Sequence, residues 1–195
     1  MRYLRLEEDL IYDGSQINPQ WAFKAFKIKE SNIISWIGPM NIHKDNIVDY
    51  EDYDKEIRGD ELLHFIIEHF DVQPADIRLC YHRQRLFITI VQDNLYKMGI
   101  KTMRKGDDLY VMEDHGKLGK LSVSIATASI NSMKIHFALN ITSEGTPTDV
   151  DITSLNECKE NLQMEMINKL ADNISENYMD ELKDIESDIT KTKVL

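Results

Sequence analysis

The sequence predicts an α+β domain in which helices cover a mainly antiparallel sheet. Residues 133–141 alternate between apolar and polar side chains, and residues 121–126 do the same, which is the two-residue period of half-buried strands. Helical spacing appears between these strands and the N-terminal third, at Leu86, Phe87, Ile90, Val91, Leu95 and Met98. Strands that follow one another after short turns favour antiparallel pairing.

Length and composition are those of one folded domain. The chain has 195 residues, of which 42% are hydrophobic and 29% charged, so it can bury a continuous core. We expect a single α+β domain over residues 1–177, followed by an acidic helix or tail over residues 178–195.

Charge and hydropathy exclude several classes of protein. A net charge of -11 argues against a nucleic-acid partner, because non-specific affinity for phosphates comes from clustered Lys and Arg. No apolar run is long enough to span a bilayer, and the first ten residues lack the apolar centre of a signal peptide. We therefore expect a cytoplasmic protein without a membrane partner, with Cys80 and Cys158 as reduced thiols.

The N-terminal third predicts a strand or bent pair over residues 2–12 and a turn over residues 13–15. Asn18 followed by Pro19 indicates the start of a helix that ends near Glu30. Residues 33–37 form a compact apolar strand, which we expect to stop at Gly38-Pro39 because proline cannot donate to a sheet ladder.

Residues 38–59 then form a polar connection rich in acid: Asp45, Asp49, Glu51, Asp52, Asp54 and Glu56. Such a run is usually a solvated loop. The alternative is a site for a divalent cation or an ammonium group.

Residues 60–70 predict a helix capped by Asp60. His64 and Glu68 would then lie one turn apart, as two ligands of one metal ion do. The alternative is a histidine hydrogen-bonded to the glutamate beside the core. With the acids of residues 49–54, the metal interpretation leads to a metal-dependent hydrolase.

Residues 77–82 alternate and predict a strand, after which the helix of residues 84–98 should end at Gly99. Residues 100–103 are extended. Residues 109–111 form a strand, His115-Gly116 turns the chain, and a hairpin with residues 121–126 follows. The last strand buries one face and presents His136 and Asn140 on the other.

The C-terminal part predicts a loop over residues 144–147 and a brief extended piece over residues 149–152. Thr153 or Ser154 caps a helix with Glu157 in its first turn. Apolar residues at near-helical steps predict about five turns. Beyond Asn177 the chain is either a last amphipathic helix or a frayed end.

Lys117 is the strongest candidate for chemistry, because a glycine-flanked turn holds it between strands. An ammonium on rigid strands in a partly closed pocket is a strong partner for a carboxylate or phosphoryl oxygen. The alternative is a solvated surface charge. Nearby cations could complete an anion site: Arg104, Lys105 and Lys120. His136 and Asn140 either line the pocket or are satisfied structural groups.

Residues 84–142 resemble the catalytic domain of the biotin and lipoate protein ligases, whose fold is related to class II aminoacyl-tRNA synthetases. Three motifs carry the resemblance. Asp107-Asp108-Leu109-Tyr110-Val111 looks like the family's Asn-Asp strand, Gly116-Lys117-Leu118-Gly119 like its lysine turn, and Ala138-Leu139-Asn140-Ile141 like its later strand. The chain is also similar to a family of uncharacterised archaeal proteins.

The resemblance implies a protein that binds a small carboxylic acid, such as lipoate, octanoate or biotin, or its adenylate. Lys117 would contact the carboxylate and phosphate, and six further residues would line the site: Asp107, Asp108, Gly116, Gly119, His136 and Asn140. It also implies ATP and Mg²⁺ as cofactors and an amine of an acceptor protein as the target. A homodimer is a candidate assembly.

Two departures bear on activity. Where the family has a Gly/Arg-rich loop over the adenylate, residues 38–52 contain no arginine and much acid. Where related octanoyltransferases have a nucleophilic cysteine, this chain has Gly145-Thr146-Pro147, which favours adenylate chemistry or simple binding over a thioester route. The hypotheses are thus a ligase or acyltransferase, a binding or regulatory protein of the same fold, and the hydrolase above.

Overall fold

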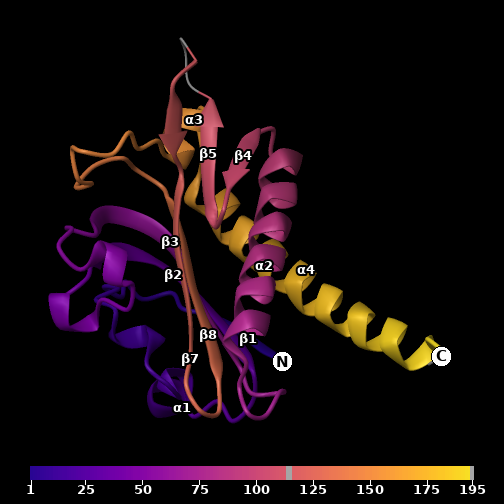
Figure 1. The fold of residues 1–195 in the computed structure, drawn as a ribbon. Helices are drawn as coiled ribbons and strands as arrows, with labels where there is room; N and C mark the ends of the chain where they lie inside the picture. Colours follow the sequence, from indigo (N-terminus) through magenta and orange to yellow (C-terminus); the bar gives the residue numbers. More distant parts are fainter. Residues whose placement is uncertain (113–115, 194–195) are drawn as a thin grey trace.

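The computed structural model describes residues 1–112 and 116–193, which form two β-sheets and a set of helices (Figure 1). In chain order the elements are β1 (Arg2–Arg5), η1 (Ser15–Ile17), α1 (Trp21–Phe26), β2 (Asn32–Asn41), η2 (Lys44–Asn46), η3 (Tyr50–Asp52), β3 (Arg58–His69), α2 (Ile77–Lys97), β4 (Thr102–Lys105), β5 (Asp108–Met112), β6 (Leu118–Lys120), β7 (Ser122–Ala128), β8 (Met133–Asn140), α3 (Leu155–Cys158) and α4 (Met164–Lys191).

The larger sheet has five strands in the order β1-β2-β3-β8-β7, and the smaller has three in the order β4-β5-β6. Only the β1–β2 pair is parallel among these named strands; the others are antiparallel. The predicted α+β class with a mainly antiparallel sheet is therefore confirmed.

Each face of the larger sheet carries its own core. Helices α2 and α4 pack against one face, and α4 continues past the sheet toward the C-terminus (Figure 1). Against the other face lie the N-terminal segment, α1 and the long β2–β3 connection, which bury a cluster around Tyr12, Trp36 and Ile66. The central strands are consequently covered on both sides.

Strand β3 overturns the helix expected over residues 60–70. Its side chains alternate between the two cores: Leu63, Phe65 and Ile67 lie on the α2 side, and Leu62 and Ile66 on the other. A strand buried on both faces is apolar almost throughout, so its sequence lacks the alternation that marks a half-buried strand. The run was therefore indistinguishable from a buried helix.

Helix α2 overturns the strand expected over residues 77–82, whereas the helix expected over residues 84–98 is confirmed. The side chain of Asp76 accepts a hydrogen bond from the Leu79 amide at 2.8 Å and caps the helix. This cap lies eight residues upstream of the expected start. The helix ends as predicted before Gly99, whose φ is 86°.

Strand β2 runs on to Asn41 instead of stopping at Gly38-Pro39. The register against β3 shifts between Gly38 and Met40, so Pro39 sits at a bulge, where a missing amide donor is tolerated. A side chain at Gly38 would collide with the Leu10 carbonyl. Glycine thus lets the N-terminal segment lie close over β2.

Two helices differ in length from prediction. Helix α1 covers only residues 21–26 of the expected 18–30, bounded by the left-handed residues Gln20 and Lys27. The expected five-turn C-terminal helix is two helices, α3 and α4, with the left-handed Asn161 between them. Beyond Asn177, α4 stays helical to Lys191.

Several local predictions are confirmed. Ser154 and Glu157 form the expected capping box at α3. Strands β5, β7 and β8 lie where expected. The expected hairpin of residues 109–111 with residues 121–126 is wrong, because β7 pairs with β8 and β5 instead forms a hairpin with β6. Of its expected turn, His115 lies outside the described residues and Gly116 has a φ of 80°.

None of the helices in residues 1–112 and 116–193 combines the length and apolar character that a membrane crossing requires.

Candidate functional site

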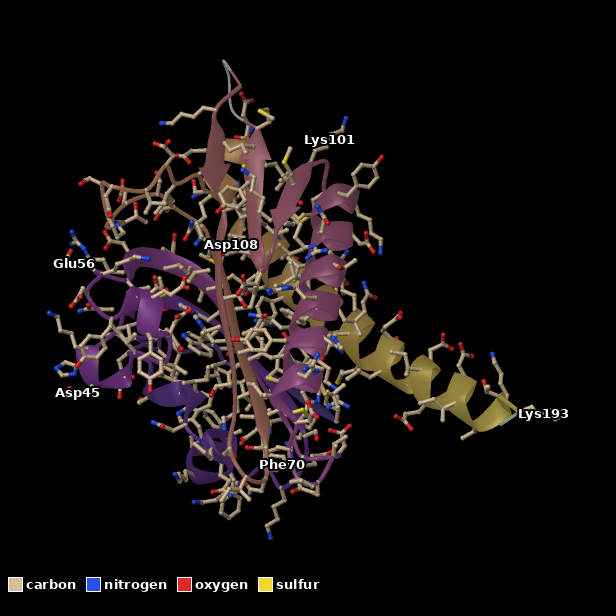
Figure 2. The ribbon with its side chains drawn as sticks, viewed as in Figure 1. Asp45, Glu56, Phe70, Lys101, Asp108 and Lys193 are labelled. Atoms are coloured by element: carbon tan, nitrogen blue, oxygen red, sulfur yellow. The ribbon has the colours of Figure 1, made fainter. Side chains whose placement is uncertain are left out.

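A cleft lies between the β2–β3 connection and the adjoining strands β7 and β8. It has a volume of about 160 Å³. Apolar side chains form its wall: Met40, Ile57, Val123, Val150 and Ile152. Figure 2 shows the connection, which carries Asp45 and Glu56, on one side and Asp108 on the sheet side. The cleft therefore combines an apolar interior with a charged rim.

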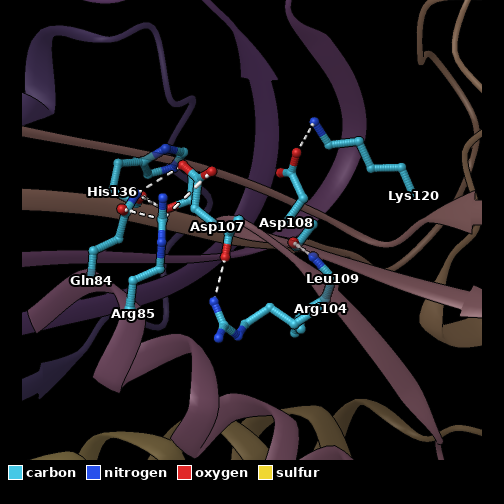
Figure 3. Close-up of polar contacts among 11 residues, drawn as sticks. Gln84, Arg85, Arg104, Asp107, Asp108, Leu109, Lys120 and His136 are labelled. Atoms are coloured by element: carbon cyan, nitrogen blue, oxygen red, sulfur yellow. Dashed lines mark hydrogen bonds and ion pairs between the residues drawn. The ribbon is translucent and has the colours of Figure 1, made fainter. Parts of the chain in front are cut away.

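Three cations line this rim, and each is paired with a carboxylate. Lys55 lies 2.6 Å from Asp52, and Arg58 lies 3.2 Å from Glu56. Lys120 lies 2.8 Å from Asp108 (Figure 3). Because the first two pairs are largely exposed and the third is more enclosed, Lys120 offers the strongest electrostatic interaction of the three.

Lys120 is held by backbone contacts on both sides. It pairs with Tyr110 across the β5–β6 hairpin, and its amide donates to the Asp151 carbonyl at 2.7 Å. Its own carbonyl accepts from the Thr153 amide at 3.1 Å and from Asn140 Nδ2 at 3.2 Å. Lys120 thus lines the cleft from a backbone that is held on both sides.

Asp108 is the counter-charge of Lys120. Burial raises the pKa of its carboxyl above the ordinary value, and the Lys120 ammonium opposes that rise. The raised pKa means that burial outweighs the ion pair. The carboxylate of an acid in the cleft would therefore contact the Lys120 ammonium, whose partner Asp108 is itself poorly solvated.

Asp107 points the other way, toward α2. Its carboxylate accepts from Gln84 Nε2 at 3.1 Å and lies 3.5 Å from the Arg85 guanidinium (Figure 3). Gln84 also donates to Ser124 Oγ at 2.8 Å. Asp107 thus connects the small sheet to α2, and Gln84 connects α2 to β7, whereas Asp108 pairs with the cleft residue Lys120.

Lys117, the lysine singled out from the sequence, lies three residues before Lys120 and pairs with Asp151 at 2.6 Å. Its side chain is 56% exposed, against 28% for Lys120. Lys117 lines neither the cleft nor the cavity beside it. Gly119 is buried within β6, and Gly116, two residues before that strand, is exposed.

A second cavity, of about 40 Å³, continues the cleft inward, sharing Asp52, Ile57 and Val123 with it. His136 lines its inner end and stacks on Tyr12, with ring centroids 3.6 Å apart. We call this part the inner cavity. Of the residues predicted from the sequence, Asn140 and His136 thus line the cleft and the inner cavity.

His136 belongs to a buried pair of histidines. Its Nε2 lies 3.1 Å from His64 Nδ1, and His64 Nε2 lies 3.1 Å from the Gly38 carbonyl. Burial lowers the pKa of His64 to about 3 and lowers that of His136 well below its ordinary value. Both imidazoles are therefore neutral at neutral pH.

The expected geometry of His64 and Glu68 is wrong, because both lie on a strand rather than on one side of a helix. Glu68 accepts from the Gln20 amide at 2.8 Å and from Ser132 Oγ at 2.7 Å, so its partner is not His64 either. Among residues 1–112 and 116–193, no three His, Cys, Asp or Glu side chains are grouped to hold a metal ion.

Cys80 and Cys158 are not joined in a disulfide. Cys80 is buried in α2 and donates to the Thr127 and Lys134 carbonyls. Burial raises the pKa of its thiol to about 11, so it is a poor nucleophile.

Sequence reasoning missed Tyr12 and Arg58. Tyr12 lies in an irregular segment without periodicity, and only its backbone bridge to Met40 brings it over the sheet. Arg58 is not a sequence candidate because the sequence predicts a loop up to residue 59 and a helix from residue 60, whereas β3 begins at Arg58. Lys120 was noted only as a neighbour of Lys117.

The family model described as Domain of unknown function (DUF366) matches residues 1–193. The chain belongs to this family. The uncharacterized protein MJ0805 of Methanocaldococcus jannaschii is 36% identical over 98% of this chain and 84% of its own length. A protein of unknown function from Pyrococcus horikoshi is 34% identical, with a TM-score of 0.86 over the whole of both chains.

Solved ligases share the fold at low identity. The biotin protein ligase from Aquifex aeolicus, in complex with biotin and ATP, has a TM-score of 0.57 and 15% identity over 91% of this chain and 70% of its own. LipL1 of P. falciparum, in complex with lipoate, has a TM-score of 0.56 and 12% identity over 92% of this chain and 63% of its own. The DUF366 chain therefore has the biotin/lipoate ligase fold.

Proposed function

We propose that this protein binds a small carboxylic acid in the cleft, with its hydrocarbon part against the apolar wall and its carboxylate at Lys120. The observation that carries the proposal is the combination of an apolar cleft with an ammonium held at its rim by the β5–β6 hairpin. Apolar lining with a few convergent polar groups is the usual composition of a small-molecule site.

The charges at the rim of the cleft favour a ligand with one negative charge over a ligand with several. The three rim cations are each matched by a carboxylate, namely Asp52, Glu56 and Asp108. A single ligand carboxylate can share Lys120 with Asp108, whose raised pKa makes its own charge easier to give up. A triphosphate would add several negative charges to a rim without net positive charge.

Activation of the acid with ATP, and its transfer to an acceptor protein, is the second candidate function. The ligases of this fold that bind biotin with ATP, or lipoate, support it. Mg²⁺ commonly binds through one or two carboxylates together with phosphates, so Asp52 and Glu56 at the rim are the residues that would hold it. The Mg²⁺ ion would supply the positive charge for the phosphates that the rim cations, each paired with a carboxylate, do not supply.

Calorimetry with octanoate, lipoate and biotin tests the proposal on wild type, Lys120→Ala, Lys117→Ala and Lys105→Ala. We expect Lys120→Ala to weaken binding by about 2 kcal/mol, the scale of one charge-assisted hydrogen bond in a desolvated pocket. Lys105, exposed on β4, is the control for general charge and should leave binding unchanged.

The Lys117→Ala arm decides between the two lysines. If it loses affinity and Lys120→Ala does not, the assignment drawn from the sequence motif holds and the one drawn from the cleft fails. Binding of none of the acids would refute the proposal. Formation of an acyl-adenylate from ATP, Mg²⁺ and a bound acid, detected by mass spectrometry, would establish the ligase alternative.

A further inference from the structure

The inner cavity ends at a histidine whose protonation is set by a chain of hydrogen bonds. The Gly38 carbonyl can only accept, so His64 Nε2 carries the proton and donates over 3.1 Å. The Nδ1 atom of neutral His64 is then an acceptor. His136 Nε2 must donate to it over 3.1 Å. In neutral His136, the remaining nitrogen, Nδ1, is therefore a bare acceptor.

This acceptor belongs to a residue that lines the inner cavity. His136 Nε2 contacts His64 on β3, and Nδ1 lies on the opposite edge of the imidazole ring. Within residues 1–112 and 116–193, no hydrogen bond reaches His136 Nδ1. The residue is only 1% exposed and lines the inner cavity. An acceptor without a protein partner, on a residue that lines a cavity, can be satisfied by a donor group of a ligand or of water.

Aromatic stacking holds the His136 imidazole in its orientation. Tyr12 stacks on it with an interplanar angle of 9°, and Trp36 stacks on His64 with ring centroids 4.9 Å apart. The two aromatic residues hold the histidine rings against the sheet. The acceptor is therefore preorganised rather than free to choose another partner.

The distance along β8 defines the ligand's length. His136 and Asn140 are four residues apart and lie on the same face of the strand, so about 13 Å separates them at the usual rise per residue. Asn140 Nδ2 donates to the Lys120 carbonyl at 3.2 Å, and both residues line the cleft. A chain of roughly eight to ten atoms spans such a distance.

We infer that the acid bound in the cleft carries a hydrogen-bond donor, an N–H or O–H group, at the end remote from its carboxylate, and that this donor is recognised by His136 Nδ1. The inference rests on the proposed function and narrows its substrate class. It distinguishes acids with a polar far end from fatty acids, whose terminal methyl would leave the acceptor unpaired.

Calorimetry with nonanoate and 8-hydroxyoctanoate tests this on the wild-type protein. The two acids have the same number of heavy atoms and differ only in a terminal methyl or hydroxyl group. We expect 8-hydroxyoctanoate to bind about tenfold tighter, the effect of one buried hydrogen bond. If the inner cavity offered no acceptor, nonanoate would bind more tightly than 8-hydroxyoctanoate, because burying an unpaired hydroxyl is unfavourable.

Two variants and one spectrum complete the test. His136→Leu should reverse the preference, whereas Val123→Ala, which removes apolar lining from both cavities, should weaken both acids and keep their ratio. Since His136→Leu leaves His64 without its donor, the variant risks misfolding. The ¹⁵N resonance of His136 Nδ1 in wild type then decides: it should move with 8-hydroxyoctanoate and not with nonanoate.

Equal binding of the two acids, or tighter binding of nonanoate, would overturn this inference and leave the proposed function standing. Failure of both to bind, together with lipoate, octanoate and biotin, would overturn both.

Discussion

At the scale of single residues, burial and neighbouring charges determine which side chains are ionised. His64 and His136 lie 3.1 Å apart in a fully buried aromatic cluster, where an imidazolium would lose its hydration and gain no carboxylate. Lys120 is charged next to Asp108, and there burial acts on the carboxylate instead. The cleft thus has an ionic end and a neutral polar end.

The neutral histidines predict a pH-dependent stability. Burial holds the folded-state pKa of His64 at about 3, below its value of about 6.5 in the unfolded chain. Between those two pH values the unfolded chain binds a proton at His64 that the folded chain does not bind. The contribution of neutral His64 to the free energy of unfolding is therefore fully present above pH ~6.5 and is lost as the pH falls toward 3. Each such histidine contributes a slope of up to about 1.4 kcal/mol per pH unit.

Urea unfolding at a series of pH values from 7.5 to 5 measures this slope. His64→Gln should be less stable at neutral pH but should have a shallower slope than wild type. His43→Gln, a change at an exposed histidine in the connection, should keep the wild-type slope. Identical slopes for wild type and His64→Gln would show that His64 is not held neutral.

At the scale of elements, the β2–β3 connection is the part best suited to move. Its two short 3-10 helices, η2 and η3, contain no buried residue. Contacts with the rest of the molecule include Asn46 Nδ2 and the His43 amide, which donate to the Asp13 carbonyl at 2.9 Å and 3.3 Å. Yet this connection forms one wall of the cleft and of the inner cavity.

We expect the amides of residues 45–56 to exchange rapidly with solvent in the ligand-free protein, because short 3-10 turns with exposed side chains open at low cost. Saturating octanoate should slow this exchange if the connection closes over the acid. Hydrogen exchange followed by mass spectrometry measures both states, with residues 133–140 of β8 as the protected reference. Strong protection of residues 45–56 without ligand would show a rigid structural segment.

At the scale of the whole molecule, α2 and α4 are joined to the sheet through one aromatic cluster. Phe87 of α2 contacts Phe65 and Phe137 of the sheet and Tyr178 of α4, with ring centroids between 5.2 and 5.6 Å apart. The Tyr178 hydroxyl also pairs with His69 at 3.0 Å. The core therefore includes α4 as far as Tyr178, and Lys193 lies at the distant end of the projecting helix (Figure 2).

Truncation locates the end of the domain. Ending the chain at Leu182 removes only the part of α4 whose described side chains are exposed, so the free energy of unfolding should change by less than about 1 kcal/mol. Ending it at Asn173 also removes Ile174 and Tyr178, which are fully buried, and should cost several kcal/mol. Thermal and urea unfolding compare the two. A large loss in the longer chain would make the projecting turns part of the domain.

The sequence by itself determined those elements whose signal is local. The alternation in β7 and β8, the helical spacing from Leu86 to Met98, and the Ser154–Glu157 capping box each depend on residues within a few positions of one another. The α+β class followed from them. The family motifs include Asp108 and Asn140, and the alternation in β8 placed His136 and Asn140 on the same face of the strand.

Only the tertiary structure decided what depends on distant partners. The sequence of β3 predicts a helix, but the residues form a strand buried between two cores. Burial on both faces makes nearly every position apolar, so the two-residue period of a strand is absent from the sequence. Which lysine faces the cleft depends on the pairing of Tyr110 with Lys120 across the hairpin. The contact of His136 with His64 joins residues 72 positions apart, through strand register that no local pattern encodes.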